Sequence, residues 1–117
     1  DSVPVGTVFT MQAGSAAQIL LAWEDPEKLH RGLVNAKFTA ANLAAVRRRG
    51  WAQSVGEREA GVASVSAPVR GPNNKVIAAV SISGPMERLS RQPGRLHAAA
   101  IVATAARLSD YLLKNNK

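Results

Sequence analysis

The sequence contains no cysteine and few aromatic residues: one Tyr, two Phe and two Trp. Without cysteine it can have no disulfide framework, no thiolate metal ligand and no thiol redox centre. So few aromatic rings offer little surface for base stacking, which argues against binding of single-stranded nucleic acid. No apolar run approaches the roughly 20 residues that a membrane-spanning helix needs. The first ten residues, DSVPVGTVFT, form neither a basic nor an apolar targeting segment. We therefore expect a soluble protein without a recognisable targeting signal.

What the chain does have is enough apolar material for one domain. It contains 117 residues, of which 46% are apolar, and this suits a single folded unit with a buried core. The sequence does not begin with methionine. We expect it to be a piece of a longer protein.

The net charge of +7 raises the possibility of a nucleic-acid or acidic-membrane partner. The densest cluster, Arg47 to Arg49, stands at the end of a predicted helix, where cations complement the helix dipole and Gly50 can supply a left-handed cap. Other cations are spread along the chain: Arg88, Arg91, Arg95, Lys114 and Lys117. A scattered basic surface is favoured, and a basic nucleic-acid-binding module remains the alternative.

Local signals predict an alternation of helices and strands. Helices are expected over residues 13–23, from Pro26 with Asp25 as its cap, from Thr39 as the cap of AANLAAVRRR, and from about Pro93 to the end. Strands are expected at WAQSV, GVASVSAPV and KVIAAVSISG, the last two joined by the turn GPNN. In the last helix, five residues are expected near one face: Leu96, Ala100, Ala103, Leu108 and Leu112.

The predicted hairpin has two different faces, because side chains alternate along a strand. One face is wholly apolar, and helices must cover it: Ala63, Val65, Ala67, Val69, Ala78, Val80 and Ile82. The other face carries small and polar residues: Val62, Ser64, Ser66, Pro68, Ile77, Ala79, Ser81 and Ser83. If a four-residue turn pairs Arg70 with Lys75, then Ser64 lies opposite Ser81.

The serines of this second face allow two interpretations. They can be the wetter side of an antiparallel sheet, which is the simpler explanation from composition. Their small size favours another, because a solvent-exposed strand tends to use Thr, Lys, Arg or Tyr, whereas Ser and Ala leave a polar hollow for a small ligand. The first turn of the first helix, Gly14 to Ala17, can present unpaired N–H groups to an anion. Ser15 as an ordinary N-cap is the alternative there.

Together, RRRGWAQSVGEREAGVASVSAPV, NNKVIAAVSISGPMERLS and FTMQAGSAAQILLAW resemble the effector-binding domain of IclR-type bacterial transcription regulators. In that family an arginine-glycine helix end leads into an aromatic residue, a Gly-Glu pair, a strand ending in Ala-Pro-Val and a Ser-x-Ser-Gly-Pro-x-x-Arg segment. The matching residues are Arg49, Gly50, Trp51, Gly56, Glu57, Gly61, Ala67, Pro68, Val69, Ser81, Ser83, Gly84, Pro85 and Arg88. Gln12 and Gln18 stand where the family often has His and Lys.

The resemblance implies an α+β fold, a curved antiparallel sheet flanked by helices and related to GAF-like sensor domains, here without its N-terminal strands. It implies a small organic or aromatic acid as ligand, bound in the cytoplasm by a homo-oligomer, a dimer or tetramer. By residue match the effector site comprises Ser15, Ala16, Ser54, Val62, Ser64, Ser81 and Ser83. DNA would be bound by a winged helix-turn-helix domain that this chain lacks.

Enzyme activity, a metal and a cofactor are not expected. The sequence has no G-x-S-x-G elbow, no S-x-x-K and no phosphate-cradling glycine loop. His30 and His97 lack a second His or Cys at metal-ligand spacing. Glu57 and Glu59 flank Arg58 and are expected to be a solvated charge run.

Overall fold

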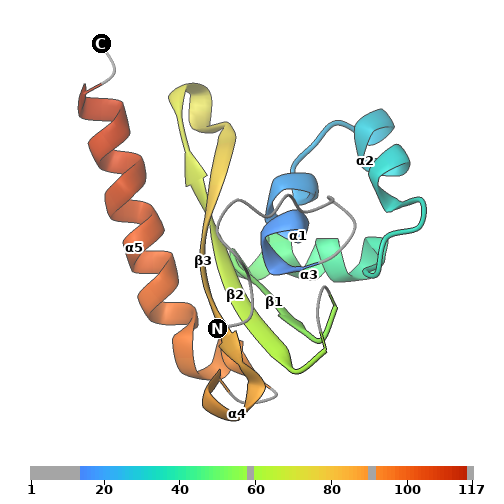
Figure 1. Ribbon diagram of the computed structural model, residues 1–117. Helices are drawn as coiled ribbons and strands as arrows, with labels where there is room; N and C mark the ends of the chain where they lie inside the picture. Colours follow the sequence, from blue (N-terminus) through green and yellow to red (C-terminus); the bar gives the residue numbers. More distant parts are fainter. Residues whose placement is uncertain (1–13, 58–59, 90–91, 116–117) are drawn as a thin grey trace, which may run out of the picture.

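An antiparallel sheet lies between two layers of helices (Figure 1) in the computed structural model, which describes residues 14–57, 60–89 and 92–115. Among these residues the sheet has the order β1-β2-β3. The strands are β1 (Ala52–Val55), β2 (Val62–Arg70) and β3 (Val76–Pro85). The helices are α1 (Ser15–Ala22), α2 (Pro26–Leu33), α3 (Ala40–Arg49), the short α4 (Met86–Leu89) and α5 (Pro93–Asn115). The predicted α+β architecture is confirmed.

Two predicted helix starts are confirmed by their capping bonds. Asp25 caps α2, where its carboxylate accepts a hydrogen bond of 2.9 Å from the N–H of Lys28. Thr39 caps α3 and exchanges two bonds with Asn42, of 3.1 and 2.8 Å, which form a capping box. At the other end of α3, Gly50 adopts the expected left-handed conformation with φ 86°. These local signals fix the helices that flank the sheet.

Each face of the sheet packs against its own helices. The apolar face predicted for the hairpin is confirmed, because Val65, Ala67 and Val69 pack against Ile101 and Ala105 of α5. On the other face α1 lies against all three strands, with α3 and α2 behind it (Figure 1). The core of this second layer comprises Ala17, Ile19, Leu21, Ala22, Phe38, Leu43, Val46 and Ala52.

The face predicted for α5 is wrong. Of the five residues expected to share it, only Leu112 packs against the core cluster, while Leu96, Ala100 and Ala103 are exposed. The contact with the sheet is made instead through Ile101 and Ala105. An alanine-rich helix gives a weak periodic signal, because alanine is compatible with either side.

The predicted strand register is also wrong, by two residues. Ser64 faces Ser83, and Ser66 faces Ser81. The hairpin turn is longer than expected, because a 3-10 turn over Pro72–Asn74 and an irregularity between Val69 and Arg70 pair Arg70 with Val76 instead of Lys75. A shift of two residues leaves every side chain on its predicted face.

Candidate functional site

The first turn of α1 lies directly over the serine face of the sheet. Ser15, the first residue of the helix, is 1% exposed, and its Oγ lies 2.6 Å from Oγ of both Ser64 and Ser66. Small residues at Gly14, Ala16 and Ala17 allow this close approach. The two features that the sequence suggested separately, the small helix start and the strand serines, therefore form one site.

Five serine hydroxyls form an unbranched chain of hydrogen bonds through this site. Beyond the two bonds of Ser15, Ser54 bonds Ser64 at 2.7 Å and Ser66 bonds Ser81 at 2.5 Å. The order of the chain is Ser54, Ser64, Ser15, Ser66, Ser81. We call it the serine chain.

The serine chain has one proton more than it uses. Each hydroxyl carries a single O–H, so five hydroxyls supply five donors while the four bonds use four. No acceptor for the fifth O–H is present in the part of the protein that the structure describes. Ser54 at one end is 6% exposed, whereas Ser81 at the other end is exposed. The spare donor can therefore reach the surface at Ser81.

The start of α1 has no side-chain cap of its own. Gly14 is the N-cap, with φ 93°, and Ser15 uses its hydroxyl on the sheet instead of capping the helix. The N–H groups of Ser15, Ala16 and Ala17 lie in the first turn, where no intrahelical acceptor exists. The helix dipole makes this end positive.

Glu57 partly neutralises this positive end. Its Oε1 accepts a hydrogen bond of 3.0 Å from the N–H of Gly14, and its Oε2 accepts one of 3.3 Å from Nε2 of Gln18. The expectation that Glu57 belongs to a solvated charge run is therefore wrong, because the loop after β1 returns its carboxylate to α1. Glu59 lies outside the described residues.

Gln18 ties α1 to the edge of the sheet. Gln18 is 3% exposed. Its side-chain amide donates to the carbonyl oxygen of Gln53 at 3.0 Å and also to Glu57. A polar cavity of about 180 Å³ lies beside these groups. It is lined by Gln18, Asn42, Ala45, Arg49, Gln53 and Glu57. Gln12 lies outside the described residues.

The remaining predicted site residues lie around the serine chain. Ser83 is exposed opposite Ser64, Val62 is partly buried at the end of β2, and Ala16 is partly buried in the first turn of α1. Three residues were missing from the predicted site: Ser66, Gln18 and Glu57. Strand alternation already placed Ser66 on the serine face, so the signal for that residue was available.

A second, larger cavity lies elsewhere. It has a volume of about 510 Å³ and separates the last turns of α5 from the hairpin end of β2. Its walls are Gly50, Ala67, Pro68, Arg70, Gly71, Asn73, Asn74, Val102, Ala105, Ala106, Ser109, Asp110 and Leu113. No residue of the serine chain lines this cavity, so the volume of the cavity says nothing about the serine site.

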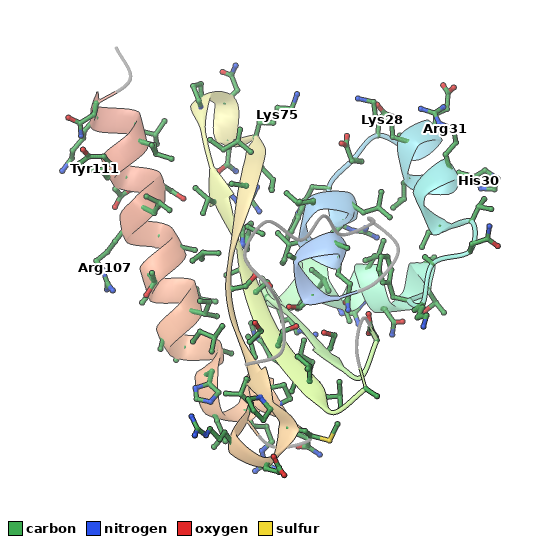
Figure 2. The ribbon with its side chains drawn as sticks, viewed as in Figure 1. Lys28, His30, Arg31, Lys75, Arg107 and Tyr111 are labelled. Carbon is green, nitrogen blue, oxygen red and sulfur yellow. The ribbon has the colours of Figure 1, made fainter. Side chains whose placement is uncertain are left out.

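Within residues 14–57, 60–89 and 92–115, the basic side chains that Figure 2 labels are spread over α2, the hairpin turn and α5. Figure 2 shows Arg107 pointing outward from α5, Lys75 at the hairpin turn, and Arg31 at the far end of the molecule on α2. Others bind the protein itself. Arg47 donates to the carbonyl oxygen of Ala22 at 2.7 Å. The guanidinium of Arg49 lies 3.8 Å from the centre of the Trp51 ring. Burial, and then the charge of Arg48, lower the pKa of Arg49.

Two further findings concern the kinds of site that the described residues could form. Residues 14–57, 60–89 and 92–115 contain no group of three or more His, Cys, Asp or Glu side chains placed to hold a metal ion. Within the same residues, every helix is too short or too polar to cross a bilayer.

The sequence of this chain matches a family of known proteins. The model of the C-terminal region of the bacterial transcriptional regulator IclR matches residues 2–110. The uncharacterized HTH-type transcriptional regulator RhmR of Escherichia coli (strain K12) is 28% identical over 120 residues, which covers 92% of this chain and 46% of RhmR. The chain thus spans about half the length of that relative.

Solved structures share the fold. A crystal structure described as that of a transcriptional regulator from Rhodococcus sp. RHA1 superposes with a TM-score of 0.85 and 27% identity, over 100% of this chain and 53% of the other. The inducer-binding domain of PobR from Acinetobacter, a double mutant in complex with 3-hydroxybenzoic acid, gives a TM-score of 0.76 at 23% identity, over 93% of this chain and 72% of that one.

Proposed function

The chain belongs to the family of IclR-type bacterial transcriptional regulators, as their C-terminal domain, and from this premise we propose that it is the part of the regulator that senses a small organic or aromatic acid. The proposed binding site surrounds the serine chain and the first turn of α1. It comprises Ser15, Ala16, Ser54, Val62, Ser64, Ser81 and Ser83.

The observation that supports this function most strongly is the spare hydroxyl proton of the serine chain. Its four bonds leave one donor, which can point outward at Ser81. An oxyanion is the natural acceptor, since hydrogen bonds to charged oxygens are stronger than those between neutral groups. The positive end of α1 stands over the same strands and favours the same charge.

The residue types at the site favour a small acid. The short Ser and Ala side chains leave space over the strands, the serines supply hydrogen-bond donors, and Val62 supplies apolar surface. The double mutant of the PobR inducer-binding domain, which has the same fold, was solved in complex with 3-hydroxybenzoic acid, an acid of this kind. The apolar contact would set the size of the ligand tail.

The acid would act by shifting the balance between conformations of a longer protein. A ligand that binds one arrangement more tightly than another changes the population of both. We propose that the DNA-binding winged helix-turn-helix belongs to a part of the regulator outside this chain, that DNA is bound through it, and that the regulator works in the cytoplasm as a dimer or tetramer.

Isothermal titration calorimetry tests the proposal directly. Two- to eight-carbon carboxylic acids, with 3-hydroxybenzoate among them, are titrated into the protein beside their uncharged amides. At least one acid should bind saturably and at least about 10-fold more tightly than its amide, because the amide lacks the charge that α1 and the serine donor favour. Equal affinities of every acid and its amide, or no saturable binding across the panel, would contradict the proposal.

A further inference from the structure

Gln53, in the middle of β1, is hydrogen-bonded to helices on both faces of the sheet. Its backbone oxygen accepts from Nε2 of Gln18 on α1 at 3.0 Å, and its side-chain Oε1 accepts from the N–H of Gly94 on α5 at 2.9 Å. One residue thus bridges the layer that carries the serine site and the layer behind the sheet.

The contact with α5 is tight. A Cβ added at Gly94 would lie 2.1 Å from Cζ3 of Trp51 and 2.9 Å from Oε1 of Gln53. The backbone of the first turn of α5 therefore lies directly against the side chains of Trp51, which precedes β1, and Gln53 in β1. A small displacement of β1 has to move α5 or break the contact, because packed groups at this distance do not deform continuously.

The contact with α1 continues to the serine site. Besides Gln53, Gln18 bonds Oε2 of Glu57, whose Oε1 accepts from the N–H of Gly14. Gly14 immediately precedes Ser15, the centre of the serine chain. A continuous path of hydrogen bonds runs from Gly14 through Glu57, Gln18 and Gln53 to Gly94.

We propose that Gln53 is a positioning residue that couples the start of α1 to the docking of the first turn of α5. The link to a ligand rests on the function proposed above. A carboxylate bound beside Ser15 repels the Glu57 carboxylate and competes with it for the N–H of Gly14. When Glu57 withdraws, Gln18 loses one of its two acceptors, and the hydrogen bond from Gln18 to the Gln53 carbonyl oxygen changes in strength. Binding on one face of the sheet is thereby transmitted to the helix on the other face.

Amide hydrogen exchange, measured residue by residue without any ligand, tests the coupling. Gln18→Met removes the amide from α1 while keeping the shape of the side chain. It should accelerate exchange at Gly94 by between about twofold and thirtyfold. Exchange at Ala105, deep in α5, should stay within about twofold of the parent. Thr104→Ala, an exposed substitution on α5, serves as the control and should change neither rate.

The two positions in α5 decide the result. Acceleration at Gly94 without acceleration at Ala105 supports the coupling. An unchanged rate at Gly94, or equal acceleration at both positions, overturns it, because a general loss of stability affects the whole helix. If Gln18→Met does not fold, Glu57→Gln provides the same readout. Since no ligand is present, failure of this experiment leaves the proposed acid binding to be judged by calorimetry alone.

Discussion

The hydroxyl oxygens of Ser66 on β2 and Ser81 on β3 lie 2.5 Å apart, and they join a fully buried side chain to an exposed one. Ser66 also bonds Ser15, so this pair connects the covered part of the serine chain to the surface.

Ser66→Ala should destabilise the protein by about 1 to 3 kcal/mol, because it breaks the two hydrogen bonds that the buried hydroxyl of Ser66 makes to Ser15 and Ser81. Urea unfolding measures the change. Ser83→Ala, on the same face but exposed, is the matched control and should stay within about 0.5 kcal/mol of the parent. Equal effects of the two substitutions would show that the serine chain contributes nothing to stability.

Gly94→Ala should destabilise the protein by about 1 to 3 kcal/mol, because the new methyl group overlaps the Trp51 ring. The sign is informative, since replacing glycine by alanine in an open helix stabilises by about 1 kcal/mol. Gly32→Ala in α2 is the comparison: the new methyl group meets the side chain of Leu21, which can turn aside more easily than an indole. Thermal unfolding should show a larger loss of stability for Gly94→Ala than for Gly32→Ala. A Gly94→Ala variant more stable than the parent would refute the close contact.

The purified chain should bind duplex DNA no better than its charge of +7 dictates. Among the described residues, Arg31, Lys75 and Arg107 lie on separate elements (Figure 2), and Arg47 and Arg49 are engaged with the protein itself. We expect the logarithm of the binding constant to fall linearly with the logarithm of the salt concentration, and the affinity to be the same for all sequences. Footprinting over a range of salt concentrations checks this, and a protected site at one sequence would favour the alternative of a basic DNA-binding module.

We expect the chain to self-associate through α5, because apolar side chains are left uncovered there. Leu96 is 62% exposed and Tyr111 is 61% exposed, and Tyr111 points away from the sheet (Figure 2). Sedimentation equilibrium should give an average mass above that of the monomer between micromolar and millimolar concentrations. The pair Leu96→Glu and Tyr111→Glu should lower this mass. A parent protein that stays monomeric over the whole range would reject the prediction.

The sequence predicts the elements of this fold better than their pairing. Asp25, Thr39 and Gly50 act on their own neighbours, so local chemistry is enough to place the helix ends. The hairpin turn depends on Asn73 and Asn74, which both adopt left-handed conformations with φ near 60°. Several turn lengths satisfy GPNN equally well, and the choice among them sets the register.

The candidate site is predictable where it depends on alternation and unpredictable where it depends on distant contacts. Alternation places Ser64, Ser66 and Ser81 on one face whichever even shift the register takes. Glu57 is different, because its partner Gly14 lies 43 residues away in the sequence. A charged residue in a loop gives no local sign of such a partner.

We expect the outward donor at Ser81 to bind the acid, and Ser81→Ala removes this donor. Thr104→Ala is the control, because its hydroxyl donates to the Ala100 carbonyl oxygen at 2.9 Å and accepts from Arg107 at 3.3 Å, and both partners lie in α5, away from the serine chain. Ser109 would be a poor control, since its Oγ accepts from the N–H of Arg70.

With the tightest-binding acid of the panel, calorimetry should show about 10- to 100-fold weaker binding to Ser81→Ala than to the parent, since a hydrogen bond to a charged oxygen contributes about 1.5 to 3 kcal/mol. Binding to Thr104→Ala should be unchanged, and circular dichroism should show the same fold in all three proteins. Equal affinities of Ser81→Ala and the parent would contradict acid binding at Ser81 and would leave the serine chain with a structural role alone.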